Sequence, residues 1–210
     1  EGFGGFEGVI AGKSEMYNYL ENANKMAFIN LDDPIQVDKT ANISVYSFSF
    51  KDVFADVCIT DSEAQPMAKI EVENTEILSN LTGTYNLTNI AIAATIGNYF
   101  NISYNEINEA VSSYFPTNNR SQWIEKQSNK ILLDAYNANP SSMKVAIENF
   151  SQLNENNKIL FLGDMFELGE YSEELHRKVG AEVEKNKIDL LFVIGDNSKY
   201  IAEEAEKNGM

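Results

Sequence analysis

The chain has 210 residues, of which 43% are hydrophobic and 11% aromatic, enough for one large domain or two smaller ones. Its 12 Phe and 10 Tyr side chains supply material for a core and exclude a disordered tail. Its 16 basic and 32 acidic residues give a net charge of −16, which disfavours nucleic acids and anionic membranes as partners. No apolar run approaches the roughly 18 residues of a membrane span, and a single cysteine, Cys58, excludes an internal disulfide.

The first half of the chain mixes helices and strands. Apolar residues at helical spacing predict a helix over 10–20, and a short buried strand is expected over 26–30. Residues 43–50 largely alternate between polar and apolar, which is typical of a half-buried antiparallel strand. Helices are predicted over about 86–100 and 103–114. The apolar stripe of the first consists of Leu87, Ile90, Ala91 and Ala94.

The second half has a different rhythm. Residues 115–119 break the pattern and are the best linker candidate. Strands are then predicted over 130–134, 158–163 and 190–195, alternating with helices over 140–153, over 172–185 and from about 198. This order indicates a parallel sheet that binds ligands at the carboxyl ends of its strands. We therefore expect an α/β protein with two domains, residues 1–117 and 118–210.

A lysine near the start of the chain is a candidate reactive group. Gly12, Lys13 and Ser14 resemble the end of a phosphate-binding loop, but Glu7 occupies the position where that loop needs its first glycine. Lys13 shares helical spacing with Met16, Tyr17 and Leu20, so we expect its side chain to leave on the apolar face. A desolvated lysine is a nucleophile or a modification site. The alternative is that its stem merely lies along apolar surface with the amine in water.

Polar residues mark several corners of the predicted fold. Asn86 and Asn89 lie three residues apart at a helix start, where they cap the helix or form a donor–acceptor pair for a purine edge. Asp134, Asp164 and Asp196 each follow a predicted strand, so we expect them at one edge of the sheet.

Two basic residues complete the set of candidates. Arg120 lies in the linker, where it could bind a phosphate between the domains. His176, the only histidine, stands among charged residues on a predicted helix, and we expect it to be a surface residue rather than a catalyst.

Three motifs together resemble the Mur ligases. They read GTYNLTNIAIAA at 83–94, DAYNANPSSM at 134–143 and GDMFELG at 163–169, followed by Ser172, His176 and Gly180. The resemblance implies that residues 1–117 are part of a central ATP-binding domain, a mixed sheet with helices whose P-loop lies upstream of Glu1. Residues 118–210 are then most of a Rossmann-like parallel-sheet C-terminal domain. We expect the sequence to be a piece of a longer protein.

The resemblance also implies roles for single residues. Lys13 matches the lysine that the family carbamylates to hold a second Mg²⁺, and Arg120 matches a catalytic arginine that approaches the ATP phosphates. Asn86 and Asn89 match the asparagines on the adenine side, and Asp134 matches an aspartate near the ribose. The region that receives the incoming amino substrate is matched by Tyr136, Asn137, Asn139, Asp164, Asp196 and Asn197.

The implied reaction is ATP-dependent amide formation in peptidoglycan precursor synthesis. ATP and Mg²⁺ activate the carboxylate of a UDP-N-acetylmuramoyl tripeptide as an acyl phosphate, which the amine of D-alanyl-D-alanine then attacks. The resemblance implies a cytoplasmic monomer. Two alternatives are a sister ligase, including one of the folylpolyglutamate type, that adds a different amino acid, and a non-catalytic nucleotide-binding module.

Overall fold

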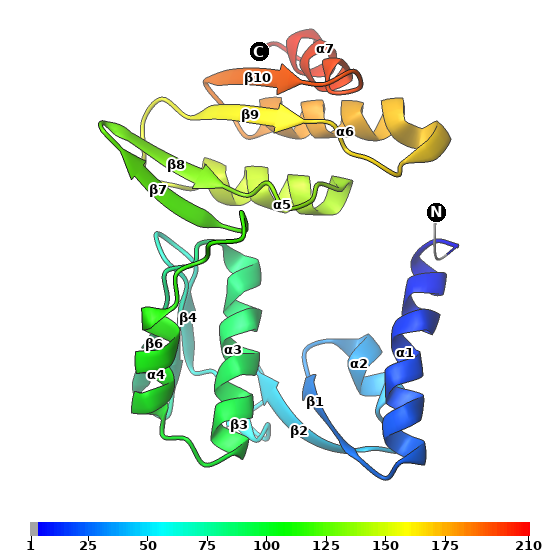
Figure 1. Ribbon diagram of the computed structural model, residues 1–210, viewed down its shortest axis with the longest axis vertical. Coiled ribbons are helices and arrows are strands. Elements are labelled where there is room, and N and C mark those ends of the chain that lie inside the picture. The colour runs from blue at the N-terminus through cyan, green and yellow to red at the C-terminus, as the bar shows by residue number, and fades with distance from the viewer. Residues whose placement is uncertain (1–3) are drawn as a thin grey trace. The chain divides into compact units, whose positions relative to one another are not determined.

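The computed structural model describes residues 4–210, which form two compact units. The N-terminal unit ends at Phe115 and the C-terminal unit begins at Pro116. Each unit combines strands and helices around a hydrophobic core of its own, so the chain is an α/β protein, as its sequence predicts (Figure 1).

The N-terminal unit has one parallel and one antiparallel sheet. β1, β2 and β3 pair in parallel, and β4, β5 and β6 pair as antiparallel neighbours. In chain order the elements are α1 (Phe6–Asn22), β1 (Met26–Asn30), α2 (Pro34–Lys39), β2 (Ser44–Ser49), β3 (Val57–Cys58), β4 (Asp61–Glu63), β5 (Lys69–Val72), β6 (Thr75–Leu78), α3 (Thr84–Tyr99) and α4 (Tyr104–Ser113). The helices and the first strand predicted for this half are confirmed.

Strand β2 differs from its prediction. The alternation over 43–50 indicates an antiparallel strand with one wet face, but β2 is parallel to both β1 and β3. Ser47 and Ser49 are buried, and acidic side chains satisfy their hydroxyl groups. Ser47 Oγ donates to Asp56 at 2.8 Å, and Ser49 Oγ donates to Asp32 at 2.7 Å. A small hydroxyl can be buried at little cost when it is hydrogen-bonded, so alternation of Ser with Phe does not indicate an exposed face.

The core of the N-terminal unit forms around α3. Ile90, Ala91 and Ala94 of its predicted apolar stripe are at most 2% exposed and pack with core residues of the two sheets. Helix α4 begins at a capping box in which Ser103 and Glu106 exchange hydrogen bonds.

The C-terminal unit alternates strands and helices, with one strand that the sequence analysis missed. Its elements are β7 (Gln122–Lys126), β8 (Asn129–Leu133), α5 (Pro140–Ser151), β9 (Ile159–Gly163), a 3₁₀ turn (Gly169–Tyr171), α6 (Ser172–Lys185), β10 (Leu190–Ile194) and α7 (Lys199–Lys207). The predicted parallel pairing is confirmed for β9 and β10. β8 instead forms an antiparallel hairpin with β7. The hairpin loop, Gln127–Ser128, lacks the Asn-Gly or Asp-Gly signal of a two-residue turn, so the local sequence does not predict the hairpin.

The helices of the C-terminal unit pack on one face of the β9–β10 pair (Figure 1). Leu160 and Leu162 point to this face and meet Ile147, Val183 and Ile201 of α5, α6 and α7. On the opposite face, apolar side chains are exposed and two phenylalanine rings stack with centroids 4.8 Å apart. These exposed residues are Ile159, Phe161, Leu190, Phe192 and Ile194.

The contact between α6 and α7 depends on a glycine, which gives a first prediction. A Cβ added at Gly180 would lie 2.3 Å from the backbone oxygen of Ile201, so the two helices must separate. Alanine gains about 1 kcal/mol of helix propensity, but overpacking costs about 1–3 kcal/mol. We expect Gly180→Ala to destabilise the C-terminal unit, measured by urea unfolding with the fluorescence of Trp123, the single tryptophan.

Gly163→Ala is the control, because its added Cβ would meet nothing closer than 3.7 Å. Equal stability of the two variants would contradict the predicted clash.

Candidate functional site

A single carboxylate joins the carboxyl ends of β9 and β10. Asp164 follows β9 directly, and its side chain accepts hydrogen bonds from three successive backbone N–H groups that follow β10. The donors are Asp196 at 3.0 Å, Asn197 at 3.0 Å and Ser198 at 2.6 Å. The last of these residues precedes α7, so the carboxylate also faces the positive end of that helix.

The turn after β10 accommodates this carboxylate only because it begins with glycine. Gly195 has φ +131°, a conformation that side chains disfavour. An added Cβ there would lie 2.3 Å from the carboxyl carbon of Asp164. Glycine is therefore required at position 195 for two reasons, its positive φ and the lack of space for a Cβ beside Asp164.

The hydrogen bonds of Asp164 set its ionisation. Burial acts to raise the pKa of this carboxyl, but the N–H groups of Ser198, Asp196 and Asn197 stabilise its charged form and hold the pKa below its ordinary value. Asp164 is thus an anionic anchor whose oxygens are directed at the backbone. In contrast, Asp196 is exposed, and Asn197 is half-buried in the same turn.

His176 is not on the surface, contrary to the sequence analysis. Its side chain is 0% exposed on α6, on the same face as Val179, Gly180 and Val183. Nε2 accepts the backbone N–H of Met165 at 3.0 Å, and Nδ1 lies 2.7 Å from the carbonyl oxygen of Ser172. Spacings of three, four and seven residues from the histidine mark the inward face. The charged neighbours of His176 are Glu173 and Glu174, which are exposed, and Arg177, which is half-buried, and they misled the prediction.

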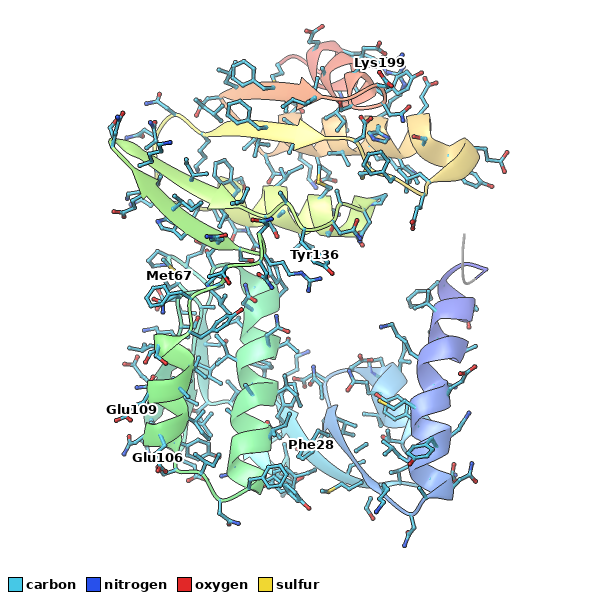
Figure 2. The ribbon with its side chains drawn as sticks, in the orientation of Figure 1. Phe28, Met67, Glu106, Glu109, Tyr136 and Lys199 are labelled. Atoms are coloured by element: carbon cyan, nitrogen blue, oxygen red, sulfur yellow. The ribbon has the colours of Figure 1, made fainter. Side chains whose placement is uncertain are left out.

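A second cluster forms around the start of the C-terminal unit. The guanidinium carbon of Arg120 lies 3.7 Å from the ring centroid of Tyr136, and both side chains are exposed. Figure 2 shows Tyr136, which follows β8. The backbone N–H of Ser121 donates to Asp134 Oδ1 at 3.3 Å, and the N–H of Ala135 donates to the carbonyl of Asn119 at 2.7 Å. These contacts bring Arg120, Asp134 and Tyr136 together although they come from the two sides of the β7–β8 hairpin.

The asparagines after β8 have local structural contacts. Asn139 caps α5, since its Oδ1 accepts from the N–H of Ser142 at 2.9 Å and from Ser141 Oγ at 2.7 Å. Asn137 Oδ1 accepts the N–H of Ala138 at 2.9 Å. The helix that begins at Pro140 confirms the helix predicted over 140–153.

Asn86 and Asn89 form a pair in the N-terminal unit. Asn86 is 4% exposed, and its Nδ2 donates to the carbonyl of Thr82 at 2.8 Å. Asn89 is exposed and donates from its Nδ2 to Asn86 Oδ1 at 3.0 Å. The inner asparagine thus orients the outer one at the start of α3.

Lys13 lies in the same unit but is exposed, which corrects the expectation of an inward lysine. Met16, on the same predicted stripe, is 56% exposed, and α1 has no buried residue. Helical spacing places Lys13 beside apolar residues, but their face is only partly covered, so the side chain of Lys13 is not desolvated. Across residues 4–210, no group of three or more His, Cys, Asp or Glu side chains could hold a metal ion.

Comparison with known proteins assigns both units to one family. Residues 1–97 match the Mur ligase middle domain, and residues 119–210 match the Mur ligase glutamate ligase domain. The chain therefore belongs to the Mur ligase family. Within the described residues, no helix has the length and apolar character that crossing a membrane requires.

Relatives of one kind match nearly the whole chain. The UDP-N-acetylmuramoyl-tripeptide–D-alanyl-D-alanine ligase of Bacillus subtilis (strain 168) is 32% identical over 208 residues, which are 98% of this chain and 45% of that protein. The ligase of the same name from Escherichia coli (strain K12) is 26% identical and covers 96% of this chain and 46% of its own length. The chain thus spans about half the length of the curated relatives it matches.

Solved structures give the same fold. MurF from Acinetobacter baumannii matches with a TM-score of 0.81 at 25% identity, over 98% of this chain and 46% of that one. MurF ligase from Thermotoga maritima, solved in complex with ADP, matches with a TM-score of 0.77 at 23% identity, over 96% and 47% of the two chains.

The ionisation of Asp164 gives a second prediction. Because its pKa is lowered in the folded protein, its contribution to stability is present above the pKa of an unfolded aspartate and is lost as pH falls through the folded pKa. We expect Asp164→Asn to lower the free energy of unfolding at neutral pH. The difference from the parent should shrink as pH is lowered from about 5 toward 3.

Chemical denaturation at a series of pH values measures this difference. Asp196→Asn, which alters an exposed carboxylate in the adjoining turn, is the control and should show a small, flat difference. A pH-independent gap for Asp164→Asn would contradict the prediction.

Proposed function

We propose that this chain is the ATP-binding and amine-binding part of a ligase that joins D-alanyl-D-alanine to a UDP-N-acetylmuramoyl tripeptide. We infer that residues 1–117 belong to the central ATP-binding domain and residues 118–210 to the C-terminal ligase domain. The observation that carries the proposal is the 32% identity to a ligase of that name, which extends over 98% of the chain and so through both units. The ligase would act as a cytoplasmic monomer in peptidoglycan precursor synthesis.

The turn after β10 is the proposed receiver of the amino substrate. Both carboxylate oxygens of Asp164 accept hydrogen bonds from backbone N–H groups, so we propose that Asp164 stabilises the turn and does not contact the substrate. The exposed carboxylate of Asp196 and the amide of Asn197 then offer acceptors to the ammonium group of the dipeptide. Tyr136 and the Asn137 amide would complete the site. Asn139 would act through its cap, which fixes the start of α5.

The Arg120 cluster is the proposed ATP contact of the C-terminal unit. Stacking on Tyr136 occupies the flat face of the guanidinium and leaves its N–H groups, which lie in its plane, free to point at phosphate oxygens. Asp134 is exposed and can accept from a ribose hydroxyl. In the N-terminal unit, Asn89 is held by Asn86 with its own Oδ1 available to the adenine amino group.

Mg²⁺ would find few ligands in this part of the chain. Since residues 4–210 hold no acidic or histidine cluster for it, the chain would contribute mainly the oxygens of a Lys13 carbamate, with phosphates and water as the remaining ligands. The carbamate forms when neutral Lys13 Nζ adds to CO₂ and releases a proton. An exposed amine is accessible to CO₂. When bound, the metal would neutralise charge on the transferred phosphoryl group.

The chain's own residues then have a defined task in the reaction. Arg120 would stabilise the negative charge that spreads over the phosphoryl oxygens as the tripeptide carboxylate is phosphorylated. Asp196 and Asn197 would orient the dipeptide amine. After its ammonium group has lost a proton to water, the amine would attack the carbonyl carbon of the acyl phosphate. The bond from this carbon to the phosphate oxygen then breaks, phosphate leaves, and the nitrogen gives up a second proton to form the amide. Exclusion of water from the acyl phosphate would be essential, because hydrolysis competes with the amine.

The proposal is tested with the complete protein that carries this chain, supplied with ATP, UDP-N-acetylmuramoyl tripeptide and D-alanyl-D-alanine. Phosphate release that requires both peptide substrates supports it. Release with another amino acid or glutamate in place of the dipeptide indicates a sister ligase, and nucleotide binding without turnover indicates a non-catalytic module.

The Lys13 assignment gives a third prediction. We expect Lys13→Ala to remove most of the ligase activity, because the carbamate is lost, and added short carboxylates such as acetate to restore part of it. The rate of phosphate release with and without acetate measures the effect. Lys25→Ala, which alters another exposed lysine near the end of α1, should be active and insensitive to acetate. If Lys13→Ala has a kcat close to that of the parent, a catalytic role of the Lys13 carbamate is contradicted.

The Arg120 cluster gives a fourth prediction. Arg120→Ala removes a charge-assisted contact worth about 1.5–3 kcal/mol, which corresponds to a loss of roughly ten- to hundredfold in kcat/KM for ATP. Asp134→Asn should raise the KM for ATP more than it lowers kcat. The double variant should lose less than the sum, because both residues belong to one cluster.

Steady-state kinetics with ATP varied measure these effects, and circular dichroism checks folding. Arg120→Lys keeps the charge but not the planar fork, so it should recover only part of the loss. Unchanged ATP kinetics in Arg120→Ala would leave the arginine as a solvated linker residue.

A further inference from the structure

Both ring nitrogens of the buried His176 are occupied. Nε2 lies 3.0 Å from the backbone nitrogen of Met165, which can only donate, so Nε2 is the acceptor. Nδ1 lies 2.7 Å from the carbonyl oxygen of Ser172, which can only accept, so Nδ1 carries the proton. The two contacts together define one neutral tautomer with its orientation fixed.

The imidazole acts on the chain next to Asp164. Met165 directly follows Asp164, and its own side chain is 2% exposed in the core of the C-terminal unit. Fixing the Met165 N–H therefore fixes the peptide unit that leads out of Asp164. The Asp164 carboxylate in turn accepts the three N–H groups of residues 196–198. One series of hydrogen bonds thus runs from α6 through the β9 exit to the β10 exit.

Filling the core does not explain this arrangement. Leucine would fill a comparable space on the inward face of α6, but it would leave the buried N–H of Met165 without an acceptor. The core requires a side chain that is buried, neutral and able to accept a hydrogen bond at one atom. Histidine and, by its Oε1, glutamine meet that description.

We propose that His176 is a positioning residue for the amino-substrate turn: through the Met165 amide it orients Asp164, and through Asp164 it holds residues 195–198 so that Asp196 and Asn197 face the dipeptide. The inference rests on the proposed function for the choice of ligand. The positioning itself depends only on the contacts of the C-terminal unit.

The first test measures the turn without any ligand. Amide hydrogen exchange of Met165, Asn197 and Ser198 is followed by NMR in the parent, His176→Leu and His176→Gln. We expect all three amides to lose protection on the order of tenfold or more in the leucine variant, since the acceptor is removed. Glutamine should restore much of it. Val183→Ala, on the same inward face of α6, is the control for general loss of core packing.

Nitrogen-15 shifts of the ring report the tautomer in the parent protein. A protonated Nδ1 and an unprotonated Nε2 are expected, and the reverse assignment would overturn the proposal. Equal exchange in the leucine and Val183→Ala variants would also overturn it, because only general packing would then be at work.

The second test measures the substrate in the complete protein. His176→Leu should raise the KM for D-alanyl-D-alanine on the order of tenfold while the KM for ATP changes less than about twofold, and His176→Gln should recover much of the loss. Equal effects on both Michaelis constants, or none on the dipeptide, would overturn the proposal. If the parent protein does not use D-alanyl-D-alanine, the proposed function fails, and the exchange and tautomer measurements alone decide whether His176 positions the turn.

Discussion

The carboxylate of Asp164 determines the shape of the sheet edge in the C-terminal unit. N–H groups in a turn and at the start of a helix lack partners in the regular backbone pattern, and here one side chain supplies acceptors for three of them. These hydrogen bonds constrain three neighbouring parts of the unit. Gly195 carries no side chain, α7 begins at a fixed point, and Met165 presents its N–H to His176. The exposed side chains of the edge depend on this frame for their directions.

The sequence predicts the longer helices and five of the strands, because burial imposes a periodic pattern on them. It does not predict the short helix α2 or the short strands β3 to β6. It fails where burial is achieved by hydrogen bonding rather than by apolar composition, as at Ser47 and Ser49 in β2. It fails also at β7, whose pairing with β8 depends on a Gln127–Ser128 loop that carries no turn signal. Partners in a sheet are chosen by contacts between segments, which periodicity within a single segment cannot specify.

In the candidate site, too, some features follow from the sequence and others depend on tertiary contacts. Asp164 and Asp196 lie at one edge, as the order of the strands predicts, but the same expectation for Asp134 is wrong, because Asp134 follows β8 of the separate β7–β8 hairpin. For His176, the spacing to Val179 and Val183 indicates the buried face, whereas its charged neighbours suggested the surface. Lys13 shows the converse error, since spacing identifies a helix face but not whether another element covers it. Sequence alone locates candidate groups, and tertiary contacts decide which of them are anchors and which are free to bind.

Gly195 and Asp164 depend on each other, so a substitution of only one of the two is destabilising. A side chain at 195 requires a shorter residue at 164, yet the shorter residue no longer reaches the three N–H groups. The reverse order is equally blocked, because loss of the carboxylate leaves the turn unsupported before any substitution at 195 can compensate. A substitution at either position alone therefore lowers the stability of the C-terminal unit. We expect the residues around this pair to vary more freely during evolution than the pair itself.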